Sequence, residues 1–256
     1  MSVVSRRILG VLEQAWLPLV LLVLWYFASA ASTNPFLPPL SSIWESFVTE
    51  LQSGRLAVNF GASLNIIVLG LLGGVVVGVV VGVAIGQSRA LRAVLNPYLQ
   101  FARSIPQVAL VPIIIGAFGI TAVPKIWAIA FACVWPVLLN TVDGIRAIDP
   151  GVRDLVQSYR ITSSKELFKV VLPAAMPQIM AGVRISLGVA VVIMVVAEIY
   201  GSTEGLGYFI NYTKGLFQPK ATWMGTLLVG LLGYALSAIF LVIEKRALHW
   251  YHASAE

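Results

Sequence analysis

Residues 152–183 read VRDLVQSYRITSSKELFKVVLPAAMPQIMAGV, the longest charged and polar segment of a mostly apolar chain. Charged side chains cost roughly 2.5–3.5 kcal/mol each at the centre of a membrane helix, so this segment is expected to lie in water. Its apolar residues recur at helical spacing, which predicts two short amphipathic helices with a turn near 160–164 and an end at Leu172 and Pro173. An ordered helical pair between membrane spans predicts a docking surface for a soluble partner.

Composition places the whole chain in a membrane. Of its 256 residues, 59% are hydrophobic and only 11% are charged, which argues against a disordered chain and against a soluble domain. A net charge of +6 is compatible with nucleic-acid binding. The basic residues, however, stand at the ends of apolar runs, as topology signals do. We therefore expect membrane lipid, and no nucleic acid, around this chain.

The apolar runs predict an all-α polytopic membrane protein with about six transmembrane helices, forming a single transmembrane domain over residues 1–256. Pro106 and Pro112 are expected to bend the third span. The first span is expected to be retained, because no small-residue cleavage site follows it. The predicted spans are 16–31, 64–85, 97–119, 126–142, 179–200 and 222–243.

Three connecting segments carry further expectations. After the prolines near residue 38, Trp44, Phe47 and Leu51 recur at helical spacing and predict an amphipathic helix at the membrane surface. Residues 87–96 and 201–220 are predicted to be loops.

The distribution of basic residues predicts the orientation. With both termini in the cytoplasm, the inner side is the more basic one, as the positive-inside rule requires. The outer side would carry Arg55, Lys125, Lys214 and Lys220. The inner side would carry Arg6, Arg7, Arg89, Arg92, Arg146, Arg153, Arg160, Lys165, Lys169, Lys245 and Arg246.

Glycines recur at every fourth position of the second predicted span and form one smooth stripe along a helix. Such stripes allow a second backbone to approach closely inside a membrane. The pattern predicts helix packing without identifying the partner helix. The stripe consists of Gly70, Gly74, Gly78, Gly82 and Gly86.

The sequence carries no pattern typical of an enzyme. It has no phosphate-binding loop of the form Gly-x-x-x-x-Gly-Lys-Ser/Thr, so any ATP-driven function would need a separate ATPase chain. His249 and His252 lack neighbouring metal ligands, and Cys133 is the only cysteine. We expect no catalytic residue, no metal site and no cofactor in this chain.

A resemblance follows from residues 167–184, LFKVVLPAAMPQIMAGVR. They are similar to the cytoplasmic coupling loop of binding-protein-dependent ABC importer permeases, in particular the nitrate, sulfonate and taurine branch. The resemblance places a coupling loop at about 143–175. In the family this loop opens with Glu-Ala-Ala, then three residues and a glycine. Here the matching positions hold Asp154, Leu155, Val156 and Arg160, so the acidic opening is kept in type while the small residues are not.

The resemblance also implies partners and roles. The family uses two permease subunits, here expected to be a homodimer, two cytoplasmic ATPases that bind ATP and magnesium, and an extracytoplasmic binding protein. It implies a multi-pass protein of the bacterial inner membrane that imports a small, anionic organic solute. The residues expected to contact the ATPase are Asp154, Leu155, Val156, Gln157, Ser158, Tyr159, Arg160, Ile161, Ser163, Leu172 and Pro173.

Four polar residues within or beside the spans are candidates for the translocation pathway: Arg103, Gln107, Asn140 and Glu198. For Arg103 the alternatives are snorkelling to the headgroups or pairing with a carboxylate. Gln107 and Asn140 are equally compatible with bonds between helices. Glu198, ahead of a Gly-Leu-Gly at 205–207 that resembles the family, either meets solute or bonds to nearby backbone at the membrane boundary.

Two other classes of function remain as alternatives. A stand-alone secondary transporter or channel would need no coupling loop and is expected to show inverted halves, which the sequence lacks. A membrane-embedded enzyme would need converging His, Asp or Ser residues within the spans.

Overall fold

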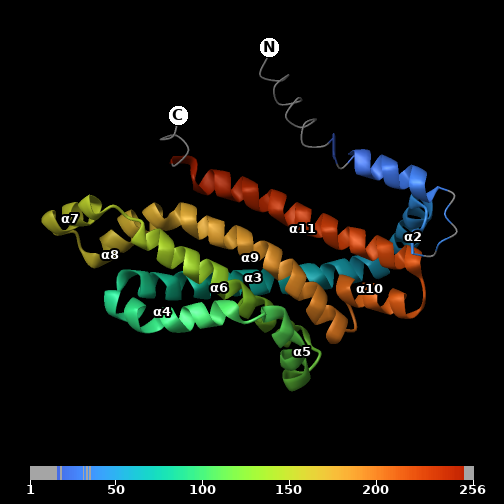
Figure 1. Cartoon of the computed structure of the whole chain (residues 1–256), viewed down its shortest axis with the longest axis horizontal. Coiled ribbons are helices and arrows are strands. Elements are labelled where there is room, and N and C mark those ends of the chain that lie inside the picture. The colour runs from blue at the N-terminus through green and yellow to red at the C-terminus, as the bar shows by residue number, and fades with distance from the viewer. Residues whose placement is uncertain (1–15, 18, 31, 33, 35, 251–256) are drawn as a thin grey trace, which may run out of the picture.

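The computed structural model describes residues 16–17, 19–30, 32, 34 and 36–250. Every regular element in this part of the chain is helical, beginning with a short apolar helix over Leu19–Ser29. Figure 1 shows an elongated bundle with α7 and α8 at one end and α2 and α10 at the other. The further elements are α2 (Leu40–Gln52), α3 (Arg55–Gln87), α4 (Arg89–Ser104), α5 (Gln107–Phe118), α6 (Ala122–Arg146), α7 (Pro150–Ser158), α8 (Ser163–Glu166), a π-helical segment (Leu167–Val171), α9 (Leu172–Tyr200), α10 (Leu206–Gly215) and α11 (Pro219–Ala247).

The structure confirms an all-helical membrane protein. Four helices are long and apolar enough to cross a membrane, and the bent pair of α4 and α5 makes up to five. The Leu19–Ser29 helix is apolar but shorter, and part of the first predicted span lies outside the described residues. The count of six spans therefore stays a prediction, whereas the amphipathic helix after the prolines is confirmed as α2.

Both segments predicted to be loops contain helices. Residues 89–96 open α4, because the Ser88 side chain caps the helix by accepting a hydrogen bond from the Leu91 N–H at 3.2 Å. Residues 206–215 form α10. The predictions of loops at 87–96 and 201–220 were wrong. A short segment with few apolar residues can still form a helix.

The predicted bend of the third span is confirmed at Pro106. Ile105, which precedes this proline, has an extended backbone, and α4 and α5 meet there at 84°. Pro112 lies within α5 without interrupting it. The segment is thus a broken span or a re-entrant loop rather than a straight crossing.

The glycine stripe packs on α6, the partner helix that the sequence left open. A Cβ atom built on Gly78 would lie 2.8 Å from the Val137 Cβ, so the two helices touch along their backbones. Both helices contribute every fourth residue to this seam, a register typical of helix packing by i±4 rows. The α6 residues opposite the stripe are Ile129, Cys133, Val137, Thr141 and Ile145.

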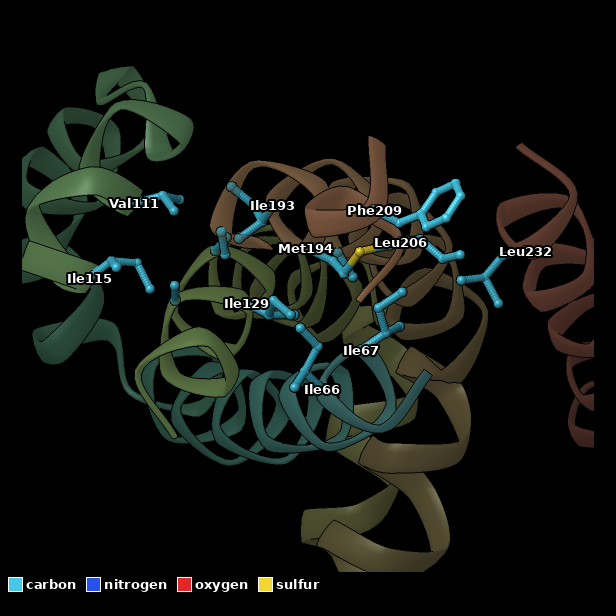
Figure 2. Packing of buried hydrophobic residues seen from close by; sticks show 14 of the residues in the cluster. Ile66, Ile67, Val111, Ile115, Ile129, Ile193, Met194, Leu206, Phe209 and Leu232 are labelled. Atoms are coloured by element: carbon cyan, nitrogen blue, oxygen red, sulfur yellow. The ribbon is translucent and has the colours of Figure 1, made fainter. Parts of the chain in front are cut away.

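The largest buried cluster lies where α3, α6 and α9 meet, towards the end that carries α10. Figure 2 shows Ile67 of α3, Ile129 of α6 and Met194 of α9 turned towards one another, with Leu206 of α10 beside them. These side chains are almost completely buried. Helix α10 is therefore part of the packed bundle.

The sequence predicted that the helical segment before α9 ends at Leu172 and Pro173. In the structure the chain stays helical through both residues. The helix continues from Ser163 to Tyr200 over 38 residues. Pro173 lacks an N–H and its ring would clash with a carbonyl of the preceding turn. The π-helical turn Leu167–Val171 directly before it is wider than an α-helical turn, and this accommodates the proline without a break.

Candidate functional site

The α7–α8 loop, residues 147–166, connects α6 to α9 at one end of the bundle (Figure 1). Helix α7 begins at Asp149, whose Oδ1 accepts a hydrogen bond from the Gly151 N–H at 2.7 Å, with Pro150 at its first position. The Arg153 guanidinium donates to the Ile145 carbonyl at 2.7 Å and so ties α7 to the end of α6. The sequence of the loop therefore specifies an ordered helix.

Helix α7 ends in a Schellman motif with Arg160 in the left-handed position. The Ile161 N–H bonds to the Val156 carbonyl at 3.1 Å, and the Arg160 N–H bonds to the Gln157 carbonyl at 3.0 Å. Arg160 has φ +48°, a conformation that costs a residue with a Cβ roughly 1–2 kcal/mol. This is the position at which the resembling family has glycine, so the departure seen in the sequence lies where glycine fits best.

The exposed apolar residues of α7 define one face. Leu155 is 57% exposed and Tyr159, one turn further on, is 77% exposed. We call this pair the coupling face. Val156, predicted to contact a partner with them, is only 6% exposed, so it is not part of this face. Of the remaining coupling residues, Asp154, Gln157, Ser158, Arg160, Ile161 and Ser163 are exposed, and Leu172 and Pro173 are partly buried.

The four pathway candidates are not joined to one another. Arg103 is exposed in the last turn of α4, and Gln107 is the half-buried first residue of α5. The Asn140 Nδ2 donates to the Pro136 carbonyl at 2.7 Å, and its Oδ1 accepts from Gln178 of α9 at 2.9 Å. Asn140 therefore joins α6 to α9. No hydrogen bond or ion pair connects any two of the four candidates within the described residues.

Glu198 belongs to a buried polar group that we call the carboxylate cluster: Asn59, Ser63, Glu198 and the backbone of 205–207. Glu198 is 1% exposed. Its carboxylate accepts from the Ser63 hydroxyl at 2.8 Å and from the Gly207 N–H at 2.7 Å. Ser63 in turn accepts from the Leu206 N–H, and Asn59 Oδ1 accepts from the Gly205 N–H, each at 2.8 Å.

The glycines of the cluster are required by its geometry. Gly205 has φ +116°, and a Cβ there would lie 2.3 Å from the Glu198 carboxyl carbon. A Cβ on Gly207 would lie 2.6 Å from the Val195 carbonyl oxygen. The cluster fastens α10 to α3 and α9. Of the two readings of Glu198, this geometry favours the bonds to nearby backbone over contact with solute.

Two further pairs were not found from the sequence. Lys125, which the sequence assigned to the outer side of the membrane, is 5% exposed and donates to the Ser202 hydroxyl at 2.7 Å. Arg184 of α9 forms a short ion pair with the buried Glu244 of α11. Ser63 lies on the buried side of α3 ahead of the glycine stripe, so its burial could have been predicted from the sequence. No local pattern, however, indicates Glu198 as its hydrogen-bond partner.

Comparison with known proteins gives the family. Residues 74–249 match the family described as binding-protein-dependent transport system inner membrane component. The chain belongs to this family. It is a permease subunit, and its role is transport rather than catalysis. The matched region includes the glycine stripe from Gly74 onwards, the α7–α8 loop and Glu198.

Several relatives that are similar to this permease over most of its length carry names that state a solute. It is 31% identical over 248 residues to SsuC of Bacillus subtilis strain 168, named as an aliphatic sulfonate transport permease, covering 96% of this chain and 90% of that protein. It is 29% identical over 241 residues to the taurine permease TauC of Escherichia coli K12, with coverages of 92% and 88%. It is 35% identical over 200 residues to the bicarbonate permease CmpB of Synechococcus elongatus, with coverages of 74% and 72%.

Solved structures show the same fold at low identity. The inward-facing methionine transporter MetNI aligns with a TM-score of 0.64 at 18% identity, covering 77% of this chain and 98% of that chain. A bacterial alginate ABC transporter, solved with an alginate-bound periplasmic protein, aligns with a TM-score of 0.62 at 14% identity, covering 94% and 97%. The permease thus has the fold of ABC transporter membrane subunits.

Proposed function

We propose that this permease provides half of the translocation pathway of an ATP-driven importer of a small anionic solute. A second copy of the same chain would provide the other half. The proposal is supported most directly by the coupling face, an exposed apolar pair on an ordered loop between two membrane spans. The chain has no phosphate-binding loop, so the energy has to come from a partner that docks on such a face.

Two cytoplasmic ATPases would bind the α7–α8 loops of the pair and hold all the ATP and magnesium. Tyr159 and Leu155 would enter a pocket of the ATPase, with Asp154, Gln157 and Arg160 at its rim. Central aromatic side chains dominate such interfaces, whereas rim charges contribute less. The permease itself needs no cofactor in this scheme.

The named solutes of the relatives support a proposal for the solute class. Sulfonates and bicarbonate are anions, and taurine carries a sulfonate group, so the shared chemistry is a small solute with an anionic oxygen group. We propose an alkanesulfonate, taurine or a similar small oxyanion such as nitrate. An extracytoplasmic binding protein would deliver it and set most of the specificity.

The proposed orientation places the α7–α8 end in the cytoplasm and the α2–α10 end outside, with both termini cytoplasmic in a bacterial inner membrane. Ser164 and Ser53 lie at the two ends, both exposed, and the native Cys133 is buried. A cysteine at Ser53 should react with an impermeant thiol reagent added to intact cells, and a cysteine at Ser164 should not. If Ser164→Cys is labelled from outside, the proposed orientation is wrong and the α7–α8 end faces outwards.

The function is tested by purifying the permease with an ABC ATPase and a binding protein from the same host, and reconstituting them in lipid vesicles. We expect the binding protein and one of taurine, an alkanesulfonate, nitrate or bicarbonate to stimulate ATP hydrolysis and to drive uptake of the labelled solute. If the permease recruits no ATPase, the importer function is excluded. If it recruits one but none of these anions is taken up, only the solute class is wrong.

A further inference from the structure

A small hollow lies between the α7–α8 loop and the rest of the bundle, at the end where Figure 1 shows α7 and α8. Its volume is about 200 Å³. Val156 lines it, whereas Leu155 and Tyr159 of the coupling face do not, so the hollow and that face lie on different sides of α7. We call it the loop hollow.

Four polar side chains line the loop hollow, and the rest of its lining is aliphatic. The polar residues are Gln87 at the end of α3, Arg153 of α7, and Ser163 and Glu166 of α8. The aliphatic side chains come from the end of α6, from α7 and from the π-helical turn before α9. The hollow therefore combines charged and hydrogen-bonding groups with an apolar wall.

Arg153 and Glu166 bring opposite charges to the same hollow without pairing. No ion pair joins them, or takes up either charge, in the part of the chain that the structure describes. One guanidinium nitrogen of Arg153 donates to the Ile145 carbonyl, and the group carries further N–H donors. Both side chains are half-buried, and the Glu166 oxygens keep accessible surface. A ligand in the hollow can therefore reach both charges.

This pair of separated charges favours a zwitterion over a simple anion. A guanidinium binds an anionic oxygen group, and a carboxylate binds an ammonium group, each through charge-assisted hydrogen bonds. A molecule that carries both groups satisfies Arg153 and Glu166 together. A simple oxyanion such as nitrate would satisfy Arg153 alone and would add a second negative charge beside Glu166.

The size of the hollow limits the ligand to a short molecule. About 200 Å³ is the space that roughly seven water molecules occupy in the liquid. Taurine, in which two carbons separate a sulfonate from an ammonium group, is of this size. The aliphatic wall would contact its carbons, and the exposed Ser163 hydroxyl and Gln87 amide offer further hydrogen bonds.

We propose that the loop hollow binds a short zwitterion, an amino sulfonate or an amino acid of similar length, from the cytoplasm. The bound ligand joins α7 to α8 and holds the α7–α8 loop against the end of α6. The loop then moves less easily with the ATPase, and transport slows. This inference rests on the proposed function, which places the loop in the cytoplasm and couples it to the ATPase.

Equilibrium dialysis of labelled taurine against the permease–ATPase complex in nanodiscs, without binding protein, tests the site. Ethanesulfonate lacks the ammonium group, and β-alanine replaces the sulfonate with a carboxylate. Glu166→Gln removes one charge at nearly constant shape. Lys165→Gln is the control, because Lys165 is the exposed neighbour of Glu166 and does not line the hollow.

We expect taurine to bind at least about tenfold more tightly than ethanesulfonate, and Glu166→Gln to weaken taurine binding about tenfold. Lys165→Gln should bind like wild type. Hydrogen exchange of the 150–171 amides should slow with taurine in wild type but not in Glu166→Gln. The tighter of taurine and β-alanine identifies the acidic group of the ligand. If neither binds to wild type, or Glu166→Gln binds taurine as wild type does, the site is wrong.

Uptake into lipid vesicles tests the effect on transport. The binding protein is outside, and ATP is inside together with either taurine or ethanesulfonate. We expect a slower initial uptake of labelled solute with taurine inside, and no such difference for Glu166→Gln. Equal rates in wild type would exclude the restraint of the loop. Uptake by a complex that binds no zwitterion would leave the proposed function standing without the site, whereas a permease that recruits no ATPase would overturn the proposed function itself.

Discussion

Arg160 and Phe217 occupy the same backbone position at opposite ends of the permease. Each follows a helix in a Schellman motif, and they are the non-glycine residues with positive φ in the described chain. Their surroundings differ. The corner at Phe217 ends α10, which the carboxylate cluster fastens to α3 and α9, whereas Arg160 lies in a loop tied to α6 mainly through Arg153.

We call the α2–α10 end completed, because buried hydrogen bonds hold α10 to α3 and α9, and the α7–α8 end incomplete, because few contacts hold α7. At the α2–α10 end, buried polar groups of the carboxylate cluster satisfy one another within the chain. At the α7–α8 end, an aromatic and a leucine side chain face solvent, and few contacts hold their helix. Damage at the first end should therefore reduce folding, and damage at the second should reduce assembly with the ATPase.

The largest loss of stability is expected at the seam between α3 and α6, because this contact runs along the bundle and connects its two ends. Gly78→Leu has no space, because even a Cβ would lie 2.8 Å from the Val137 Cβ. We expect a loss of about 3 kcal/mol of folding free energy, measured by thermal unfolding of purified permease. Val80→Leu is the control, since Val80 of the same helix is 64% exposed. Equal tolerance of both changes would mean that the seam is not a shared support.

Glu198→Ala tests the completed end. It leaves the Ser63 hydroxyl and the Gly207 N–H without an acceptor in a buried site. We expect a loss of about 2–3 kcal/mol in unfolding free energy, with little direct effect on ATPase binding by the folded fraction. Glu204→Ala is the control, because Glu204 is exposed. A Glu198→Ala protein as stable as wild type but unable to transport would instead make Glu198 a pathway residue.

Tyr159→Ala tests the incomplete end and should have the opposite signature. Tyr159 is 77% exposed, so its removal should leave the unfolding temperature of the isolated permease unchanged. Retention of the ATPase on purified permease should weaken by about 2 kcal/mol, as expected for an aromatic anchor. Lys165→Ala should retain the ATPase nearly as well as wild type. The reverse order of these two variants would replace the pocket with a charge-based contact.

Arg160→Gly should have the smallest effect, and a stabilising one. Glycine adopts φ +48° without strain, so we expect about 1 kcal/mol of local stabilisation, offset in part by the greater freedom of glycine in the unfolded chain. Hydrogen exchange of the 156–162 amides should slow. Faster exchange would show that the arginine side chain, rather than the backbone motif, holds the turn. If ATPase retention also falls, Arg160 contacts the partner.

Sequence patterns anticipated what is periodic or local. The glycine stripe fixed which face of α3 packs, and the missing glycine at Arg160 marked a turn whose backbone the structure shows to be left-handed. The patterns failed where a short capping signal or a local change of helix type determines where a helix begins or ends. Ser88 starts a helix in a predicted loop, and the π-helical turn carries α9 past Pro173.

The carboxylate cluster was beyond reach for a different reason. Ser63 and Glu198 lie 135 positions apart, and nothing in the sequence near either residue names the other. Asn59 likewise bonds to the backbone of Gly205, 146 positions away. Such pairings follow from how α3, α9 and α10 are packed, so they become visible only when that packing is known.

The unbroken helix from Ser163 to Tyr200 has a mechanical consequence. Its 38 residues correspond to roughly 55 Å at the usual rise of an α-helix. One end begins in the α7–α8 loop, and the other carries Glu198. Between them, Arg184 pairs with Glu244 of α11, and Gln178 bonds to Asn140 of α6. Because one continuous helix joins the two ends, a displacement imposed at Ser163 is transmitted along it to the carboxylate cluster at Glu198.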